Sequence, residues 1–458
     1  MTWTDLRPPA TPDPALLHLF DDRVPRYTSY PTAPQFGPLV TATAYRRWLM
    51  ELPDVPLSLY LHIPFCQQLC WYCGCATVVA RRPGPVDAYR DLLRREIAMV
   101  ADAVGRRQRV SHIHFGGGTP NILSAAQFED LMAALQAAFD CDGAEVAVEI
   151  DPRVLADDFV AAFGRAGVAR ASIGVQDFAP AVQAAINRVQ TIEQTRSAVE
   201  RLRAAGVTGI NLDLVYGLPH QTEAGIVESV EAALGLSPDR LALFGYAHVP
   251  WMRRHQQLVD EAALPDGPAR WRQYRAAGDR IAEAGFRRIG LDHFARPYDT
   301  LTDALDAGRL HRNFQGYTAD DAPILLGFGA SAISQLPQGY VQNPAGVPAY
   351  GDILKAGRLA TVRGIVMTDE DRLRGSIIER LMCDLVIDLE AICRDHDADW
   401  RRFAPELAAL SRFENAGVLV RQGPILIVTE AGRVLLRSIA AAFDAYRTPD
   451  SRRHARAV

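Results

Sequence analysis

The sequence has few cysteines, no long apolar run and no excess of positive charge. Its net charge of -5 argues against a general affinity for nucleic acid, which calls for a basic surface. No window approaches the ~18 uninterrupted apolar residues of a membrane-spanning helix. Met1–Pro9 has no apolar stretch following a basic region, so we also expect no signal peptide. Only seven cysteines occur in 458 residues, and Cys141, Cys383 and Cys393 are scattered. We therefore expect a cytoplasmic protein whose isolated thiols stay reduced.

The other four cysteines are crowded into the ten residues Cys66–Cys75. Thiolates packed so closely repel one another unless a cation or a cluster holds them. Cys66, Cys70 and Cys73 form a C-x3-C-x2-C pattern, which leaves one metal position without an evenly spaced fourth ligand. That arrangement fits an iron–sulfur cluster with three cysteine ligands and one open iron.

Three other interpretations of this segment remain open at this point. A structural zinc site needs a closed set of four ligands, and Cys75 would supply the fourth. The spacing of Cys73 and Cys75 is tight for one tetrahedron, however, and no second C-x2-C pair follows. A disulfide framework calls for an oxidising compartment and usually a short secreted chain. The last interpretation is a set of small buried residues, and we favour the cluster over all three.

Short apolar strands alternate with amphipathic helices from residue 57 to about 335. Ser124–Gln127 and Thr191–Gln194 have the pattern of capping boxes that begin two of the helices. Such alternation predicts an α/β fold with a parallel sheet and helical crossovers. Six or seven units indicate a barrel or an incomplete one, with its chemistry at the C-terminal strand ends. The expected strands are Leu57–Ile63, Ser111–Phe115, Glu145–Ile150, Arg170–Val175, Gly209–Val215, Arg240–Tyr246 and Arg288–His293.

The rest of the chain predicts two additions to this barrel. Residues 1–56 are rich in proline and lack periodicity, so we expect an arm that lies on the barrel of residues 57–335. Residues 336–458 read as mainly helical, with a hairpin around Gln422–Pro424. Helices followed by such a wing are winged-helix-like. This region has no concentrated basic face before Arg452–Arg456, so we expect a lid or packing role rather than DNA binding.

The expected strand Ser111–Phe115 ends in a turn with three consecutive glycines, Gly116–Pro120. Glycines let backbone approach a ligand closely, with its amides and carbonyls free to bond. A tight strand-to-helix turn would explain them as well. This turn comes one β/α unit after the cysteine segment, and the two together resemble the radical S-adenosylmethionine (SAM) enzymes.

Further motifs extend the resemblance over nearly the full length. The chain is similar to the family of oxygen-independent coproporphyrinogen III oxidases (dehydrogenases). The motifs that carry this similarity are Arg26–Thr32, Tyr60–Phe65, Cys73–Cys75, Glu149–Arg153, Gly174–Phe178, Ile186–Arg188, Asp213–Pro219, Tyr246–His248, Leu291–Pro297, Arg312–Tyr317 and Ser331–Ser334.

The resemblance implies a fold and a set of cofactor ligands. The fold would be a radical SAM partial (β/α)6-type barrel with the N-terminal arm and the C-terminal domain added. Cys66, Cys70 and Cys73 would ligate a [4Fe–4S] cluster. The SAM on the cluster would contact the positions Tyr60, Gly117, Glu149 and Ile333. A second SAM molecule would contact Tyr72, Gly118, Thr119, Gln176, Arg188, Asp213 and Ala247.

Without the resemblance, the sequence supports a binding role more strongly at some of these positions than at others. Glu149 and Asp213 end core strands, where a carboxylate is costly without a partner, which already favours a site. Gln176 and Arg188 fit ordinary polar surface as well, and Tyr60 fits a core. Three isolated histidines read as hydrogen-bonded structural residues rather than metal ligands: His62, His248 and His293.

The activity implied is oxidative decarboxylation of two propionates of coproporphyrinogen III to vinyl groups, which gives protoporphyrinogen IX in haem biosynthesis. A 5′-deoxyadenosyl radical from SAM would remove hydrogen from the propionate β-carbon, and loss of CO2 and one electron would complete the vinyl. The resemblance also implies an unidentified reductant and a terminal electron acceptor, and we expect a monomer. The residues expected near the substrate are Arg26, Tyr27, Tyr30, Cys75, Arg296 and Gln315.

Two rival functions remain. A haem chaperone of the same superfamily shares the cysteine loop and the glycine turn but binds haem. The segments Cys73–Cys75 and Arg26–Thr32 favour the oxidase, because those chaperones typically lack both. The other rival is a non-enzymatic redox or iron-sensing protein with a winged-helix tail, against which the weak charge of that tail argues.

Overall fold

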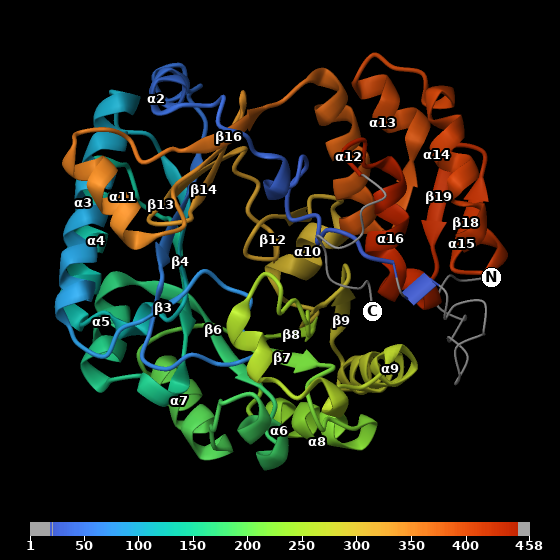
Figure 1. Ribbon diagram of the computed structural model, residues 1–458, viewed down its shortest axis with the longest axis horizontal. Coiled ribbons are helices and arrows are strands. Elements are labelled where there is room, and N and C mark those ends of the chain that lie inside the picture. The colour runs from blue at the N-terminus through green and yellow to red at the C-terminus, as the bar shows by residue number, and fades with distance from the viewer. Residues whose placement is uncertain (1–18, 21, 448–458) are drawn as a thin grey trace.

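The fold is organised around one large sheet that curves into an incomplete barrel (Figure 1). The computed structural model describes residues 19–20 and 22–447. Seven neighbouring strands of the sheet run parallel, and antiparallel strands extend it at both edges. In spatial order the strands are β16 (Arg363–Val366), β15 (Gly339–Gln342), β14 (Ile333–Leu336), β13 (Ile324–Phe328), β1 (Leu57–Ile63), β4 (Val110–Gly117), β5 (Glu145–Ile150), β6 (Val168–Gln176), β7 (Gly209–Tyr216), β8 (Arg240–Gly245), β10 (His293–Ala295) and β9 (Arg287–Ile289). The predicted α/β partial barrel is confirmed.

Helices form the outer layer of the barrel (Figure 1). The strand β1 is buried along almost its whole length, as expected for a parallel strand covered on both faces. Both predicted capping boxes are confirmed, at the starts of α4 and α7. No helix among the described residues is long and apolar enough to cross a membrane. The barrel helices are α3 (Gly84–Val104), α4 (Ala125–Ala138), α5 (Asp157–Ala166), α6 (Pro180–Ala185), α7 (Ile192–Ala204), α8 (Glu223–Leu234), α9 (Gly267–Glu283) and α10 (Thr300–Asp306), with the short 3-10 helices η2 (Pro120–Ile122), η3 (Pro152–Val154), η4 (Arg254–Leu258) and η5 (Glu261–Ala263).

The last expected strand of the parallel series is wrong. Arg288–His293 does not form one parallel strand, because the chain reverses there into the antiparallel hairpin of β9 and β10. Gly290 sits in the turn with φ of 52°, and the hydroxyl of Tyr317 accepts a hydrogen bond from Leu291 N at 3.0 Å. The strand β13, which we did not predict, takes a parallel place beside β1 instead. All its residues are buried, so it lacks the alternation that marks a half-exposed strand.

The large sheet continues past the expected domain boundary at residues 335 and 336, through β14, β15 and β16. Beyond it lies a separate layer of helices and a three-stranded sheet (Figure 1). The predicted hairpin around Gln422–Pro424 is confirmed, and a third strand pairs with it. Apart from β16, the elements after β15 are α11 (Val347–Lys355), α12 (Asp369–Asp384), β17 (Val386–Asp388), α13 (Leu389–Asp395), η6 (Trp400–Phe403), α14 (Ala404–Ala409), α15 (Ser411–Asn415), β18 (Leu419–Gln422), β19 (Ile425–Val428), η7 (Glu430–Leu435), α16 (Leu436–Ala440) and η8 (Ala441–Phe443). The basic tail Arg452–Arg456 lies outside the described residues.

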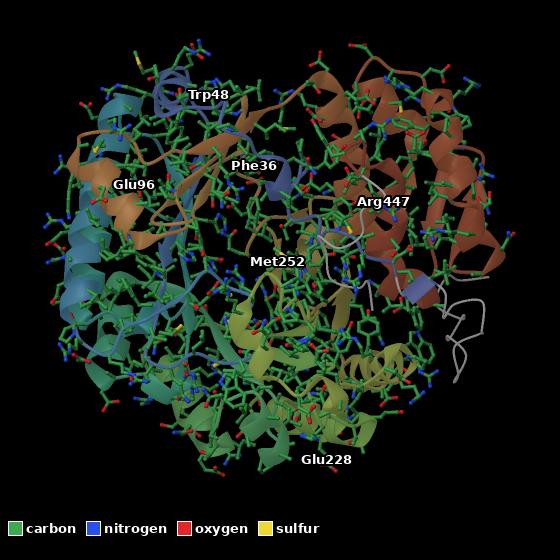
Figure 2. The ribbon with its side chains drawn as sticks, in the orientation of Figure 1. Phe36, Trp48, Glu96, Glu228, Met252 and Arg447 are labelled. Carbon is green, nitrogen blue, oxygen red and sulfur yellow. The ribbon has the colours of Figure 1, made fainter. Side chains whose placement is uncertain are left out.

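The described part of the N-terminal arm connects the sheet edge to the C-terminal region. Its ordered pieces are η1 (Ala33–Gln35) and α2 (Ala42–Met50). Gly37 bridges to Gly364 in β16, and the ring of Phe36 stacks on that of Tyr340 with centroids 5.5 Å apart. Phe36 and Trp48 are labelled in Figure 2, near the top of that view. The arm is therefore packed into the molecule after its first 18 residues, which lie outside the described part.

Candidate active site

The cysteine segment forms a loop at the C-terminal end of β1. The short strands β2 (Phe65–Cys66) and β3 (Val78–Val79) pair across its base. Burial raises the pKa of the Cys66 thiol to about 11. The pKa of Cys73 falls to about 7, because the thiol of Cys75 and the backbone N–H of Cys75, 3.4 Å from Cys73 Sγ, donate to its sulfur. Cys73 is thus the thiol of the loop that ionises most readily among those with a shifted pKa.

The three predicted cluster ligands share one cavity. The described residues contain no group of three His, Cys, Asp or Glu side chains that could hold a single metal ion. In an iron–sulfur cluster the ligand thiolates surround the cluster instead. Cys66, Cys70 and Cys73 all line one cavity of about 590 Å³, which has room for a cluster and more.

Two arginines lie against the sulfur of Cys70. Arg153 Nη2 and Arg188 Nη1 each lie 3.7 Å from Cys70 Sγ, within hydrogen-bond reach of a sulfur. Asp151 holds both guanidinium groups, at 2.7 Å from Arg153 Nη2 and 3.5 Å from Arg188 Nη1. Arg188 also donates to Gly174 O at 2.6 Å, while its buried Nε has no hydrogen-bond partner. This pair of cations suits a thiolate-bound, negatively charged group beside Cys70.

The glycine turn after β4 lies directly against the cysteine loop. A side chain at Gly118 would come within 2.8 Å of Phe65 O and 3.0 Å of Cys66 Sγ. Gly117 has φ of 121°, and a side chain there would come within 2.8 Å of the ring of His62. The backbone amide of Gly118 donates to Ile63 O at 2.8 Å, and the hydroxyl of Thr119 donates to Cys66 Sγ at 3.3 Å. Only glycine permits this approach, so the turn is fixed by its contact with the loop.

The first predicted set of SAM-binding positions lines a second cavity, of about 530 Å³, inside the barrel. Glu149 accepts a hydrogen bond from Gly117 N at 2.9 Å, and its other oxygen lies 3.3 Å from His114 Nε2. The hydroxyl of Tyr60 lies 3.0 Å from His62 Nδ1, and burial raises the pKa of Tyr60 well above its ordinary value. All four predicted positions line this cavity: Tyr60, Gly117, Glu149 and Ile333.

The second predicted set lines the cavity that holds the cysteines. Asp213 accepts hydrogen bonds from Ser172 Oγ at 3.0 Å and Asn211 Nδ2 at 2.7 Å. Burial raises the pKa of Asp213 to about 6 despite these donors. Gln176 has a left-handed backbone with φ of 73°, at a bulge between β6 and β7. All seven predicted positions are present there: Tyr72, Gly118, Thr119, Gln176, Arg188, Asp213 and Ala247.

The two cavities meet at a shared wall. Gly117, Glu149 and Asp213 line both, and so do two of the expected substrate contacts, Cys75 and Gln315. Cys75 is the exposed cysteine of the loop, and the buried Oε1 of Gln315 has no hydrogen-bond partner. Figure 2 places Met252, which lines the 590 Å³ cavity, near the middle of the molecule. The 590 Å³ cavity lies at the C-terminal ends of the barrel strands, and the 530 Å³ cavity runs through the barrel interior.

The other expected substrate contacts differ in whether they line a cavity. Arg26 is exposed and lines the 590 Å³ cavity. Tyr27 and Tyr30 are buried and bond to the C-terminal region, through Asp444 Oδ2 and Ala445 N, each at 3.0 Å. Arg296 lines none of the cavities described here, because its guanidinium donates to Pro238 O and Ala284 O and stacks on Phe286. The arm thus contributes Arg26 to the cavity and its two tyrosines to the core.

The sequence analysis did not identify two residues that hydrogen-bond to the backbone of the cysteine loop. Gln256, in η4, is fully buried and donates to both Tyr72 O at 2.9 Å and Ala247 O at 3.1 Å. The neighbouring His255 Nε2 lies 2.7 Å from Cys73 O. The sequence signal was weak, because nothing near Gln256 is patterned and its partners are backbone groups far along the chain. The three histidines that read as structural do make hydrogen bonds within the protein: His62, His248 and His293.

Comparisons with known proteins agree with this geometry. Residues 60–233 match the radical SAM superfamily, and residues 367–435 match the HemN C-terminal domain. The barrel, the cysteine loop and the glycine turn define a radical SAM protein. The chain is 53% identical over 440 residues to the oxygen-independent coproporphyrinogen III oxidase of Bradyrhizobium diazoefficiens, covering 96% of this chain and 98% of that one. Its identity to the protein of the same name from Salmonella typhimurium is 39%, with 95% of each chain covered.

A solved structure, of the coproporphyrinogen III oxidase HemN from Escherichia coli, is similar to this fold throughout. The TM-score is 0.89 at 37% identity, and the match covers 95% of this chain and 99% of that chain. The chain belongs to the family of oxygen-independent coproporphyrinogen III oxidases. It is a radical SAM enzyme, and its cofactors are a [4Fe–4S] cluster and SAM.

Proposed function

We propose that the protein converts coproporphyrinogen III to protoporphyrinogen IX without oxygen, by oxidative decarboxylation of two propionate side chains to vinyl groups in haem biosynthesis. The observation that carries this proposal is the near full-length similarity to proteins of that name. The site supports it, because the cysteine loop, the glycine turn and Arg26 all face one connected pair of cavities.

The bound cluster and SAM supply one electron and the 5′-deoxyadenosyl radical that removes hydrogen from a propionate β-carbon. The chain's own residues supply placement. Gly117 and Gly118 let the turn pack directly against the cysteine loop, and Glu149 fixes the turn through Gly117 N at 2.9 Å. The strand ends that line the two cavities would hold the reacting groups in position. An unidentified acceptor takes the electron that remains after CO2 leaves.

A second SAM molecule belongs to this proposal. The seven positions assigned to it line the 590 Å³ cavity, and the four assigned to the SAM on the cluster line the 530 Å³ cavity. Arg188 and Asp213 are its charged contacts: a guanidinium with a free buried Nε and a carboxylate with a raised pKa. Both suit a zwitterionic ligand that carries a carboxylate and an ammonium group.

We further propose that the protein works as a monomer in the cytoplasm with an unidentified reductant. The thiols of Cys66, Cys70 and Cys73 must stay reduced until the cluster forms, which the cytoplasm ensures.

The decisive experiment incubates the reduced, cluster-loaded protein anaerobically with SAM and coproporphyrinogen III. We expect two CO2 per protoporphyrinogen IX formed, with methionine and 5′-deoxyadenosine as co-products. Stable retention of haem without CO2 release would instead identify a haem chaperone. Absence of SAM cleavage under all conditions would contradict enzymatic activity altogether.

A further inference from the structure

A small cavity of about 30 Å³ opens beside the cavity that holds the cysteines. The two share Arg26, Ala247, Asp292 and Arg312 as lining residues. We call the small cavity the side pocket. It is far smaller than the neighbouring cavity of about 590 Å³, so it suits a small polar group rather than a ring.

Arg312 is the key residue of the side pocket. It belongs to the short strand β11 (His311–Arg312), which pairs with β12 (Tyr317–Thr318). Its side chain is 5% exposed, yet its Nε and Nη1 have no hydrogen-bond partner. The guanidinium lies over the ring of Tyr317, 4.4 Å from its centroid. A buried guanidinium with open donors is costly unless an acceptor completes it.

The nearest carboxylate, that of Asp292, does not accept a hydrogen bond from these Arg312 donors. Asp292 Oδ1 lies 3.6 Å from Arg312 Nη1, which is too long for a hydrogen bond, and the same oxygen lies 2.8 Å from His293 Nδ1. Burial opposes ionisation of Asp292, but Arg312, His293 and Arg26 outweigh it and hold its pKa well below its ordinary value. Asp292 is therefore an ionised carboxylate shared between two cationic or donating neighbours.

Further arginines surround the side pocket. Arg26 lies at its exposed side, while Arg270 and Arg437 line its walls and make other contacts in the chain as well. Arg437 comes from α16 in the C-terminal region. Burial and the positive charge of Arg26 lower the pKa of Arg437 to about 10. Among the described residues, four arginines therefore line the side pocket against one carboxylate, that of Asp292, and this excess of positive charge favours an anion.

We propose that the side pocket binds one carboxylate of the tetrapyrrole substrate, with Arg312 as the buried donor and Arg26 as the donor at the mouth. This inference rests on the proposed function, in which the substrate carries four propionates. A planar carboxylate accepts two hydrogen bonds from a guanidinium, which matches the open Nε and Nη1 of Arg312. The side pocket would anchor a propionate that does not react, and so would set which propionates reach the radical.

The amino-acid end of a SAM molecule is another source of a carboxylate, since Ala247 lines both cavities. The test therefore separates the two sources. It uses cluster- and SAM-loaded protein and two unreactive probes, coproporphyrin III and its tetramethyl ester, with binding followed by fluorescence. In Arg312→Gln and in Arg26→Gln we expect the Kd of the tetraacid to rise about tenfold or more. Ester affinity, iron content and bound SAM should match those of the parent protein.

Arg287→Gln is the matched control, because Arg287 pairs with Asp306 at 2.8 Å on the surface. It should leave the affinity for both probes unchanged. Equal weakening of acid and ester in the two test variants would overturn the proposal. Loss of bound SAM with unchanged tetraacid affinity would overturn it too, because the carboxylate would then be that of SAM.

If Arg312→Gln lowers the yield of folded protein, Arg26→Gln still tests the proposal, because Arg26 is exposed. CO2 release by the parent protein is scored separately, so failure of the proposed function is distinguishable from failure of the side pocket.

Discussion

The barrel and the C-terminal region contribute to the central cavities in different ways. The barrel supplies polar side chains at consecutive strand ends, including Glu149 and Asp213, together with the cysteine loop. The described C-terminal region reaches only the side pocket, through Arg437. Its other link to the site is indirect, since Asp444 and Ala445 hold the arm that carries Arg26. In our proposal the barrel therefore holds the cofactors and the buried Arg312, while the arm and the C-terminal region add Arg26 and Arg437 to the side pocket.

Substitution of single cysteines in the loop should have the largest effect, and it tests whether the barrel holds the cluster. Cys66→Ala, Cys70→Ala and Cys73→Ala should each abolish the bound iron, because each takes one ligand from a cluster that has only three. Cys75→Ala should retain most of the iron but impair turnover. Iron and sulfide assays on reconstituted protein measure this, and equal iron loss in all four variants would point to a four-cysteine site.

A substitution at Asp213 tests the proposed second SAM separately from the SAM on the cluster. Asp213→Asn should lower occupancy of the second SAM by tens-fold, since loss of one partner in a buried charged contact costs roughly 2–5 kcal/mol. Iron content should not change. Bound SAM is counted in anaerobic protein, with Asp384→Asn in α12 as the control carboxylate. Unchanged SAM stoichiometry with full activity would remove Asp213 from the site.

Glu96 tests how far the barrel's stability depends on pH. It lies on α3, at the left of Figure 2, and accepts hydrogen bonds from Gly329 N, Asn343 and Tyr350 at 2.7 Å. Burial raises its pKa to about 7 in spite of these donors. The folded protein thus keeps this proton to higher pH than the unfolded chain does. Its free energy of unfolding should fall by about 3 kcal/mol as pH rises from the ordinary carboxyl range through 7.

Denaturant unfolding of cofactor-free protein between about pH 5 and pH 8 measures this slope. Glu96→Gln carries no titrating proton and should flatten the curve. Parallel curves for the two proteins would show that Glu96 does not titrate in this range.

The guanidinium beside Cys70 offers a finer test of the barrel. Arg153→Gln removes a charge-assisted donor 3.7 Å from Cys70 Sγ. Reduction adds negative charge to the cluster, so loss of this donor should make the reduction potential more negative, on the order of tens of millivolts. Potentiometry with spectroscopic detection measures the shift. Arg165→Gln on the surface, where Arg165 pairs with Glu129, should leave the potential unchanged.

The smallest effect concerns the arm. Tyr27→Phe removes one hydrogen bond to Asp444 and should cost about 1 kcal/mol of stability. Iron and SAM content should stay the same, whereas the KM for coproporphyrinogen III should rise modestly because Arg26 is held less firmly. A loss of iron in this variant would contradict the separate roles of the barrel and of the arm with the C-terminal region.

The sequence predicted the barrel more fully than the substrate side. The strand β1 and both capping boxes follow from local patterns, whereas the SAM-binding positions were implied by the family resemblance. The hairpin of β9 and β10 depends on Tyr317, 26 positions from Leu291, so no local pattern showed it. Tyr27 and Tyr30 were expected near the substrate, because their actual partners, Asp444 and Ala445, lie at the far end of the described chain. The open donors of Arg312 are likewise visible only in three dimensions.

The contact between the arm and the C-terminal region has a consequence for synthesis. Tyr27 and Asp444 are 417 positions apart, so the arm docks there only after residue 444 has left the ribosome. The cysteine loop and the parallel strands of the barrel are translated well before that. The contact between the arm and the C-terminal region is therefore among the last in the molecule that can form during synthesis.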